Sequence, residues 1–217
     1  MKTKARHQVQ RIKDRAHYDR ETAYSILDAA FLAHVGFSTG TQPFVIPMLY
    51  VRRDDTLLLH GSIASRLLKD VGGGIEACAN VTIVDGLVLA RSHFHHSVNY
   101  RSVVAFGKAQ PITDTDEKIA ALKHFVEAML PGRALESRAP DKNELAATSV
   151  LRFDIDDISA KIRSGGAKDD KDDLSLPYWA GVVPMRTTYA TPQPSDDCSL
   201  ALPESVRRLF NTPPAEA

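Results

Sequence analysis

The chain has 217 residues, 43% of them hydrophobic and 25% charged, which is enough for one domain with extensions. Its 27 basic and 27 acidic residues cancel, so no field of one sign favours nucleic acid or an anionic membrane. The first twenty residues are polar and basic, and no uncharged apolar run approaches ~18 residues, so we expect neither a secretory signal nor a membrane span. Cys78 and Cys198 lie far apart, which favours a reduced, cytoplasmic protein without a disulfide.

The N-terminal part of the chain predicts an arm followed by a helix. Residues 1–17 alternate in charge with little periodicity, so we expect them to form the arm. Asp19 is suited to cap the helix that follows. The spacing of the apolar residues predicts that the buried face of this helix comprises Ile26, Leu27, Ala30 and Phe31.

Strand patterns dominate the next eighty residues. Gly40 and Gly86 fall in expected turns, where glycine tolerates a positive φ, and Asp54-Asp55 suits a hairpin bend. Three glycines, residues 72–74, are expected to end the short helix after Lys69. The predicted strands are His34–Ser38, Phe44–Val51, Thr56–His60, Ile75–Val84, Leu87–Ser92 and Arg101–Pro111.

Two further helices precede a last predicted strand, Val150–Ile155. Asp114 with Glu117, and Asp141 with Glu144, have the spacing of capping boxes. The first of these helices should run to Leu130 with an apolar face of Ile119, Leu122, Val126 and Met129. Five or six antiparallel strands with inserted helices suit a small closed or nearly closed barrel. We therefore expect one domain over residues 18–186 and a flexible tail, rich in Pro, Ser and Asp, over residues 187–217.

The hairpin over residues 44–60 leads into polar residues that are suited to bind a phosphate. Ser65, Arg66 and Lys69 stand at the start of the short helix, where N–H groups, a hydroxyl and a guanidinium converge on one anion. Gly61 would permit close approach of the backbone. The alternative is a solvated helix face on which Arg66 and Asp70 form an i,i+4 pair worth about 0.3–0.5 kcal/mol.

The strand that contains Pro47 is a second candidate element. Proline cannot donate a hydrogen bond to a sheet, so Pro47 favours an edge or a ligand-facing stretch over a central strand. A barrel strand with a bulge at Pro47 is the other interpretation, and the residues alone do not separate the two.

The order and spacing of these segments, together with Asn99–Ala109 and Trp179–Pro184, resemble the FMN-binding split barrel of the pyridoxamine-phosphate-oxidase-like superfamily. The branch that the chain resembles contains flavin-nucleotide-binding and nitroimidazole-reductase-like proteins, and the resemblance spans Arg11 to Arg186. It implies a mainly β fold, a six-stranded antiparallel split barrel with peripheral helices. It also implies a homodimer that binds two FMN molecules in the clefts between its subunits.

The resemblance further assigns roles to particular residues. The strand at residues 45–48 would offer backbone groups to the ring edge, and residues 60–62 would contact the ribityl chain and phosphate. In relatives a Lys often follows the Arg of the Ser-Arg step, whereas here Leu67 does so and Lys69 is left to compensate. The cofactor-binding residues implied are Val45, Ile46, Pro47, Met48, His60, Gly61, Ser62, Ser65, Arg66, Lys69, Tyr100, Arg101, Ser102 and Trp179. The alternative to a cofactor contact is a surface cation for Arg101 and a core aromatic side chain for Trp179.

His93, His95 and His96 form a cluster that invites a metal interpretation. On a strand His93 and His95 would share one face and His96 the other, and no carboxylate or cysteine completes a set at metal-site spacing. We therefore predict no metal site. The stronger alternative is that this loop borders the flavin pocket and contacts substrate or haem.

The resemblance implies an FMN-dependent oxidoreductase that acts on a small ring compound, by nitroaromatic reduction or by pyridoxamine-phosphate-type oxidation. The second chemistry is the weaker option, because the basic, His-containing C-terminal segment of that enzyme is matched here by Arg186 alone. The alternative from another class is a flavin- or haem-binding carrier or redox sensor without turnover. The substrate, the electron donor and the choice between FMN and a deazaflavin stay open.

Overall fold

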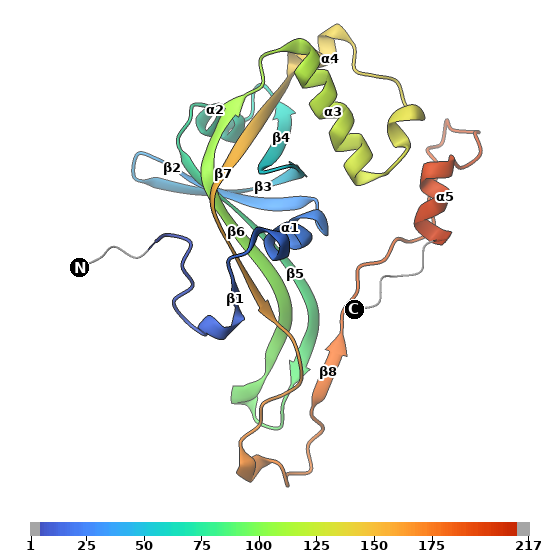
Figure 1. Ribbon diagram of the computed structural model, residues 1–217. Helices are drawn as coiled ribbons and strands as arrows, with labels where there is room; N and C mark the ends of the chain where they lie inside the picture. Colours follow the sequence, from blue (N-terminus) through green and yellow to red (C-terminus); the bar gives the residue numbers. More distant parts are fainter. Residues whose placement is uncertain (1–4, 212–217) are drawn as a thin grey trace.

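Six antiparallel strands close into a barrel in the computed structural model, which describes residues 5–211 (Figure 1). Each strand pairs with two neighbours in the ring β7–β4–β3–β2–β5–β6–β7. This confirms the predicted mainly β, six-stranded split barrel. The strands are β2 (Leu32–Thr39), β3 (Gln42–Arg53), β4 (Thr56–Ser62), β5 (Glu76–Leu89), β6 (Ser97–Pro111) and β7 (Thr148–Arg163).

Short elements and helices surround the barrel. Strand β1 (Ala16–His17) pairs with β7, and β8 (Gly181–Pro184) pairs with β5. The single-turn 3₁₀ helices are Lys13–Arg15, His93–His95, Arg133–Leu135 and Lys171–Asp173. The α-helices are α1 (Arg20–Asp28), α2 (Arg66–Gly72), α3 (Thr115–Met129), α4 (Lys142–Ala147) and α5 (Glu204–Asn211). No helix among the described residues is both long enough and apolar enough to cross a membrane.

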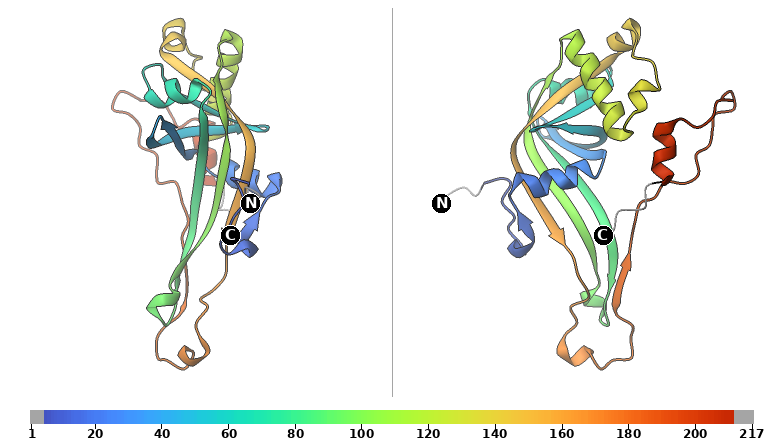
Figure 2. Two further views of the ribbon diagram at one scale, coloured as in Figure 1. Left: turned by 90° about the vertical axis from the view of Figure 1, so that its left-hand side faces the viewer. Right: turned by 45° about the vertical axis from the view of Figure 1, so that its right-hand side comes forward.

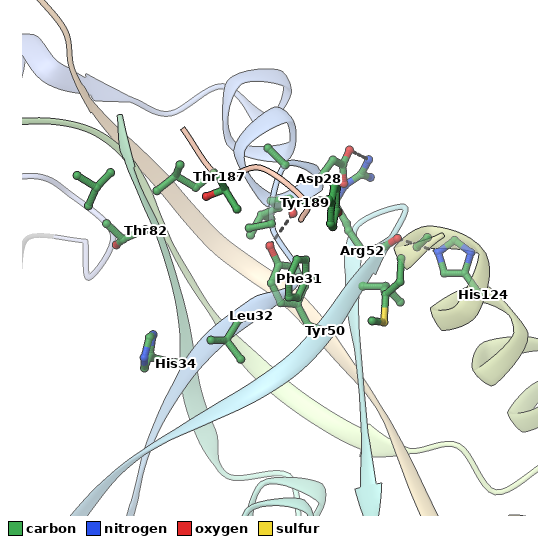
Figure 3. A pocket seen from close by; sticks show the side chains of 18 of the residues that line it. Asp28, Phe31, Leu32, His34, Tyr50, Arg52, Thr82, His124, Thr187 and Tyr189 are labelled. Atoms are coloured by element: carbon green, nitrogen blue, oxygen red, sulfur yellow. Dashed lines mark hydrogen bonds and ion pairs between the residues drawn. The ribbon is translucent and has the colours of Figure 1, made fainter. Parts of the chain in front are cut away.

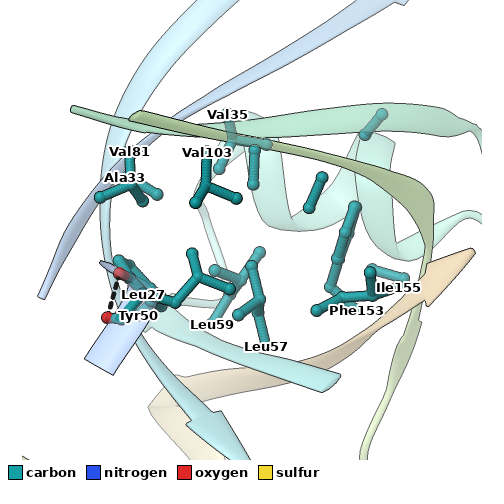
Figure 4. Close-up of a cluster of buried hydrophobic side chains, with 14 of the residues drawn as sticks. Leu27, Ala33, Val35, Tyr50, Leu57, Leu59, Val81, Val103, Phe153 and Ile155 are labelled. Carbon is teal, nitrogen blue, oxygen red and sulfur yellow. Dashed lines mark hydrogen bonds between the residues drawn. The ribbon is translucent and has the colours of Figure 1, made fainter. Parts of the chain in front are cut away.

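Apolar side chains from all six strands fill the barrel interior (Figure 4). Leu57, Val103 and Phe153 are completely buried there, which is the burial that stabilises a fold of this kind. A second, smaller cluster lies between α3 and β4, and it includes Leu58 and Phe125. Closure also requires Gly107 in β6, because a Cβ at this position would lie 1.8 Å from the carbonyl oxygen of Asp154 in β7.

The predicted caps Asp19, Asp114 and Asp141 are confirmed. Asp19 accepts a hydrogen bond from the Thr22 N–H at 2.8 Å, and Asp141 and Glu144 form both bonds of a complete capping box. The predicted apolar faces are right only in part, since Ile26 and Leu27 are buried in α1. Helix α1 ends at Asp28, so Phe31 lies beyond it and is 53% exposed. In α3 the buried residues are Ala121 and Phe125, whereas Met129 is 46% exposed.

The predicted turn at Asp85-Gly86 is wrong, because β5 continues through it as a single strand with a β-bulge. Gly86 is buried against β8, where an added Cβ would lie 2.9 Å from the carbonyl oxygen of Val183. Strands β6 and β7 are correspondingly longer than predicted and extend beyond the barrel (Figure 2). We call this extension, residues 85–100 with residues 164–184 packed beside them, the ribbon.

Both terminal segments contact the barrel domain. Arg6 pairs with Asp157 at 2.7 Å and with Glu76 at 2.5 Å, so described residues of the N-terminal arm cover part of β5 and β7. Near the other end, Ser205 at the start of α5 hydrogen-bonds the Glu136 carboxylate. The composition of residues 187–217 did not predict this helix.

Candidate functional site

The barrel has an opening between β3 and β4. Strand β4 pairs with β3 only over Tyr50–Arg53, and its last residues, His60–Ser62, pair with β7 instead. Residues 42–49 of β3 therefore pair with β2 alone, and no described strand lies along their other edge. The expectation that Pro47 lies in an edge stretch is confirmed. We call this opening the split.

The free edge of β3 presents unpaired backbone groups to the split. Successive residues of an antiparallel strand direct their N–H and C=O groups to alternate sides. The Tyr50 N–H donates to the Phe31 carbonyl at 3.0 Å on the β2 side, so Val45, Pro47 and Leu49 direct their backbone groups into the split. The Val45 side chain is 68% exposed, whereas Ile46 and Met48 pack against the core.

Arg66, beside the split, and Lys69, three residues further along α2, have no anionic partner among the described residues. Ser65 caps α2 by accepting a hydrogen bond from the Leu68 N–H, and Ser62 accepts one from the Ala64 N–H at 3.1 Å. The Arg66 guanidinium lies 5.2 Å from the centre of the Phe44 ring in β3, so it reaches across the opening. Neither Arg66 nor Lys69 forms an ion pair with any described residue.

The predicted alternative partner of Arg66 is engaged elsewhere. The Asp70 carboxylate accepts a hydrogen bond from the Thr39 hydroxyl at 3.4 Å, and it makes no ion pair with Arg66. The structure thus lacks the helix-face ion pair and leaves the guanidinium available to a ligand.

His60 and Gly61, also predicted site residues, contact helices rather than the split. The His60 imidazole packs edge-on against Phe125 of α3, with ring centres 4.3 Å apart, and this burial lowers its pKa. Gly61 faces α2, where an added Cβ would lie 3.1 Å from Leu68. Because Gly61 has no side chain, Leu68 of α2 can pack closely against the end of β4.

The predicted residues Tyr100, Arg101 and Ser102 lie in a second place. The bulge in β5 directs Asp85 toward Arg101, and the two side chains form a bidentate pair with contacts of 3.0 and 2.7 Å. Ser102 donates to the Lys161 carbonyl at 3.3 Å, and Tyr100 is half-buried. Ser102 is paired with Thr82 of β5. Thr82 lies six residues from the start of β5, which follows α2, so the distance along the strand is roughly 20 Å at ~3.3 Å per residue.

The ribbon carries Trp179 and the histidine loop. Trp179 is 66% exposed and its ring lies against Gly181. His95 contacts Asp170 at 3.2 Å, His96 contacts the Ser92 carbonyl at 2.9 Å, and Phe94 between the histidines is 87% exposed. Among residues 5–211, no three His, Cys, Asp or Glu side chains gather closely enough to hold a metal ion.

Sequence reasoning missed a groove of about 880 Å³ on the outer face of the barrel (Figure 3). The end of α1, strands β2, β3 and β5, helix α3 and the segment after β8 line it. In β2, exposed Leu32 and His34 alternate with completely buried Ala33 and Val35. An apolar residue on the outward face of a half-buried strand is the signal that would have indicated this surface. Its lining includes Phe31, Leu32, His34, Thr82, Met129 and Tyr189.

A closed six-stranded barrel with a split beside unpaired cations defines the split-barrel class that the sequence resembles. A family model described as pyridoxamine 5'-phosphate oxidase matches residues 19–162. The chain belongs to this family, which confirms the resemblance. A search of curated proteins found no match.

Three solved structures are similar to the chain. The flavocytochrome Anf3 from Azotobacter vinelandii is 37% identical, with a TM-score of 0.88 over 94% of this chain and 96% of that one. A FAD and haem binding protein from Mycobacterium smegmatis is also 37% identical, with a TM-score of 0.86 over 90% and 97%. A protein described as a 5-nitroimidazole antibiotic resistance protein from Bacteroides thetaiotaomicron is 22% identical, with a TM-score of 0.58 over 68% and 86%, and it supports the fold alone.

Proposed function

We propose that the protein binds a flavin nucleotide, with FMN as the first candidate, in the split between β3 and β4. The observation that carries this proposal is that Arg66 lies beside an unpaired strand edge without an anionic partner among the described residues, with Lys69 on the same helix. A flavin phosphate is an anion, and guanidinium and hydroxyl groups are its normal protein ligands. In this proposal Ser62, Ser65, Arg66 and Lys69 hold the phosphate.

The free edge of β3 suits the other end of the cofactor. Val45 offers both an N–H and a C=O to the split, and Pro47 offers a C=O only, so the edge presents donors and acceptors to a polar ring. Ile46 and Met48 anchor the strand to the core behind this edge. A bound flavin would supply the electron chemistry, and the chain would supply orientation and exclusion of water.

The names of two similar structures add FAD and haem to the candidates. One is a flavocytochrome and the other a FAD and haem binding protein, and this chain covers nearly all of both. FMN and FAD share the ring and the first phosphate, which are the parts that the proposed site would hold. Chromatography of the flavin released from purified protein distinguishes them.

We also propose that the protein acts as a homodimer with a flavin at each subunit interface. The residues predicted to bind cofactor lie in two groups, one near the split and one on β6 and the ribbon. In the proposed dimer, the second group of one subunit lies beside the first group of its partner. Exposed apolar side chains on the ribbon, including Leu87, Val98 and Val183, are suited to such an interface.

The proposed activity is that of a cytoplasmic flavin-dependent oxidoreductase acting on a small ring compound, such as a nitroaromatic. A carrier or redox sensor without turnover is the second candidate, favoured by the names of two similar structures, a flavocytochrome and a FAD and haem binding protein. Stopped-flow mixing of the flavin-loaded protein with NAD(P)H and candidate acceptors separates them. In an enzyme, the flavin absorbance should bleach with the donor and recover with the acceptor through repeated turnovers. In a carrier, no donor should support turnover of an acceptor.

The flavin site is tested with Arg66→Ala. Loss of a hydrogen bond to a charged group should weaken FMN binding by about 1.5–3 kcal/mol, or about tenfold to a hundredfold in Kd. Arg207→Ala on distant α5 is the control and should leave the Kd unchanged. Fluorescence-quenching titration gives both constants, and an unaltered Kd in Arg66→Ala would remove Arg66 from the site.

The same samples test the interface. Light scattering should give a dimer mass, and saturating FMN should raise the melting temperature because it binds only the native state. A monomer that holds one FMN per chain at full occupancy would contradict a shared site.

A further inference from the structure

The groove on the outer face of the barrel contains a histidine without a partner. His34 lies on the outward side of β2, exposed to the groove, and it makes no hydrogen bond or ion pair with any described residue. His124 lines the same groove but uses its Nε2 atom to contact the Arg52 carbonyl at 3.0 Å. Figure 3 shows His34 at one end of the groove, apart from Arg52 and His124. The His34 imidazole is therefore available to a ligand.

The walls of the groove suit a large, flat, mainly apolar molecule with polar edges. Phe31, Leu32 and Met129 are 53%, 46% and 46% exposed, so apolar area is present that the chain itself does not cover. Thr82 and Tyr189 add hydroxyl groups to this lining. The volume of about 880 Å³ lies within the range of cofactor sites, which combine apolar walls with a few polar groups.

The register of the sheet connects this histidine to the proposed flavin site. His34 is directly opposite Pro47 in the β2–β3 pair. The alternation established by Tyr50 makes this a non-hydrogen-bonded pair, in which the Cα atoms lie about 4.5 Å apart. Since the Pro47 carbonyl faces the split, a group bound to His34 would be separated from the proposed flavin ring by about one strand.

We propose that His34 is the axial ligand of a haem that lies in this groove, next to the flavin. Neutral imidazole is the commonest protein ligand of haem iron, and the porphyrin requires apolar walls of the kind described. The proposal rests on the proposed function, in which haem is one of the cofactor candidates. It goes further by choosing one histidine. His34 lines the apolar groove, whereas His93, His95 and His96 lie on the ribbon and are not part of the groove lining.

The experiment is a titration of the full-length protein with hemin, followed by its Soret absorption. Wild type should show a saturable, shifted Soret band at one hemin per chain. His34→Ala should lose this band, and added imidazole should restore it in His34→Gly, where the space of the side chain is open. His124→Ala in the same groove and His96→Ala on the ribbon should both keep the wild-type band.

Two further measurements make the outcome unambiguous. Circular dichroism and the FMN titration, run on every variant, show that the fold and the flavin site are intact. An unchanged Soret band in His34→Ala, its loss in His96→Ala, or no saturable hemin binding by wild type would each overturn the proposal. Because Arg66→Ala reports on flavin alone, the haem proposal can fail while the flavin proposal stands.

Discussion

Inside the barrel, Leu57 and Phe153 are completely buried among apolar side chains. In the ribbon and at its base, arginine side chains add links to strands that are already paired. Arg101 pairs with Asp85, and Arg163 hydrogen-bonds Asn99 and two carbonyl groups of the following loop. At the far end, Arg91 binds Asp169 through both its backbone N–H, at 2.8 Å, and its guanidinium, at 2.7 Å. The large apolar core therefore lies in the barrel, whereas charged hydrogen bonds reinforce the strand pairing of the ribbon.

This difference bears on where ligands bind. The barrel interior is filled, so both proposed sites lie outside it, one at the free edge of β3 and one on the outer face of β2. The ribbon offers exposed side chains such as Phe94 and Trp179 on a scaffold whose polar contacts are local. We therefore expect substitutions in the barrel to act on the whole domain and substitutions in the ribbon to act nearby.

The largest effect is expected from Leu57→Ala in the barrel. Leu57 is completely buried, and leucine-to-alanine changes in such cores cost about 2–5 kcal/mol. Leu174→Ala, at a position in the ribbon that is 57% exposed, should change stability by no more than about 0.5 kcal/mol. Denaturant unfolding of both variants makes the comparison, and equal losses would show that the ribbon contributes to the same core.

An intermediate and local effect is expected from Arg91→Gln. Burial alone would raise the pKa of Asp169, but hydrogen bonds from Arg91 hold it below its usual value. Loss of the guanidinium would leave a buried carboxylate short of a donor, at a cost of about 1–3 kcal/mol. Hydrogen exchange should show lost protection in residues 165–173 with unchanged protection in β4. Uniform loss across the barrel would contradict local control of the ribbon.

The smallest effect concerns the pH dependence of stability. Burial against Phe125 lowers the pKa of His60 below its usual value of 6.5. The folded state therefore binds this proton less readily than the unfolded state, and stability is fully present above pH 6.5 and decreases as the pH falls below it. His60→Gln should flatten this decrease in unfolding curves recorded at pH 7.5 and 5.5. His93→Gln on the ribbon controls for the loss of an imidazole, and a slope identical to wild type in His60→Gln would refute the assignment.

Much of the fold was predictable because its determinants are local. Asp19, Asp114 and Asp141 cap the helices as predicted, and Gly40 adopts the positive φ that its turn requires. The alternating patterns also predicted β2, β3 and β4 to within a few residues. The prediction was wrong at Gly86, because a Gly that permits a turn equally permits close packing of a third strand, and only the approach of β8 decides between these.

In the candidate site, too, the sequence predicted the features that depend on one residue and not those that depend on distant neighbours. Pro47 indicated a free strand edge, since the missing N–H is a property of the residue itself. The orientation of His60 toward α3, the capture of Arg101 by Asp85 and the absence of a partner for Arg66 are properties of side-chain neighbours from distant segments. No spacing along the chain specifies those neighbours.

By itself the sequence determined the closed antiparallel barrel, its capped helices and the clustering of Ser65, Arg66 and Lys69 after a hairpin, because hydrophobic periodicity, capping and turn chemistry act over a few residues. Only the tertiary structure decided the split between β3 and β4, the long ribbon and the groove that exposes His34. These depend on where strands stop pairing and on which residues of different strands lie opposite one another, and that register is set by the packing of the whole sheet.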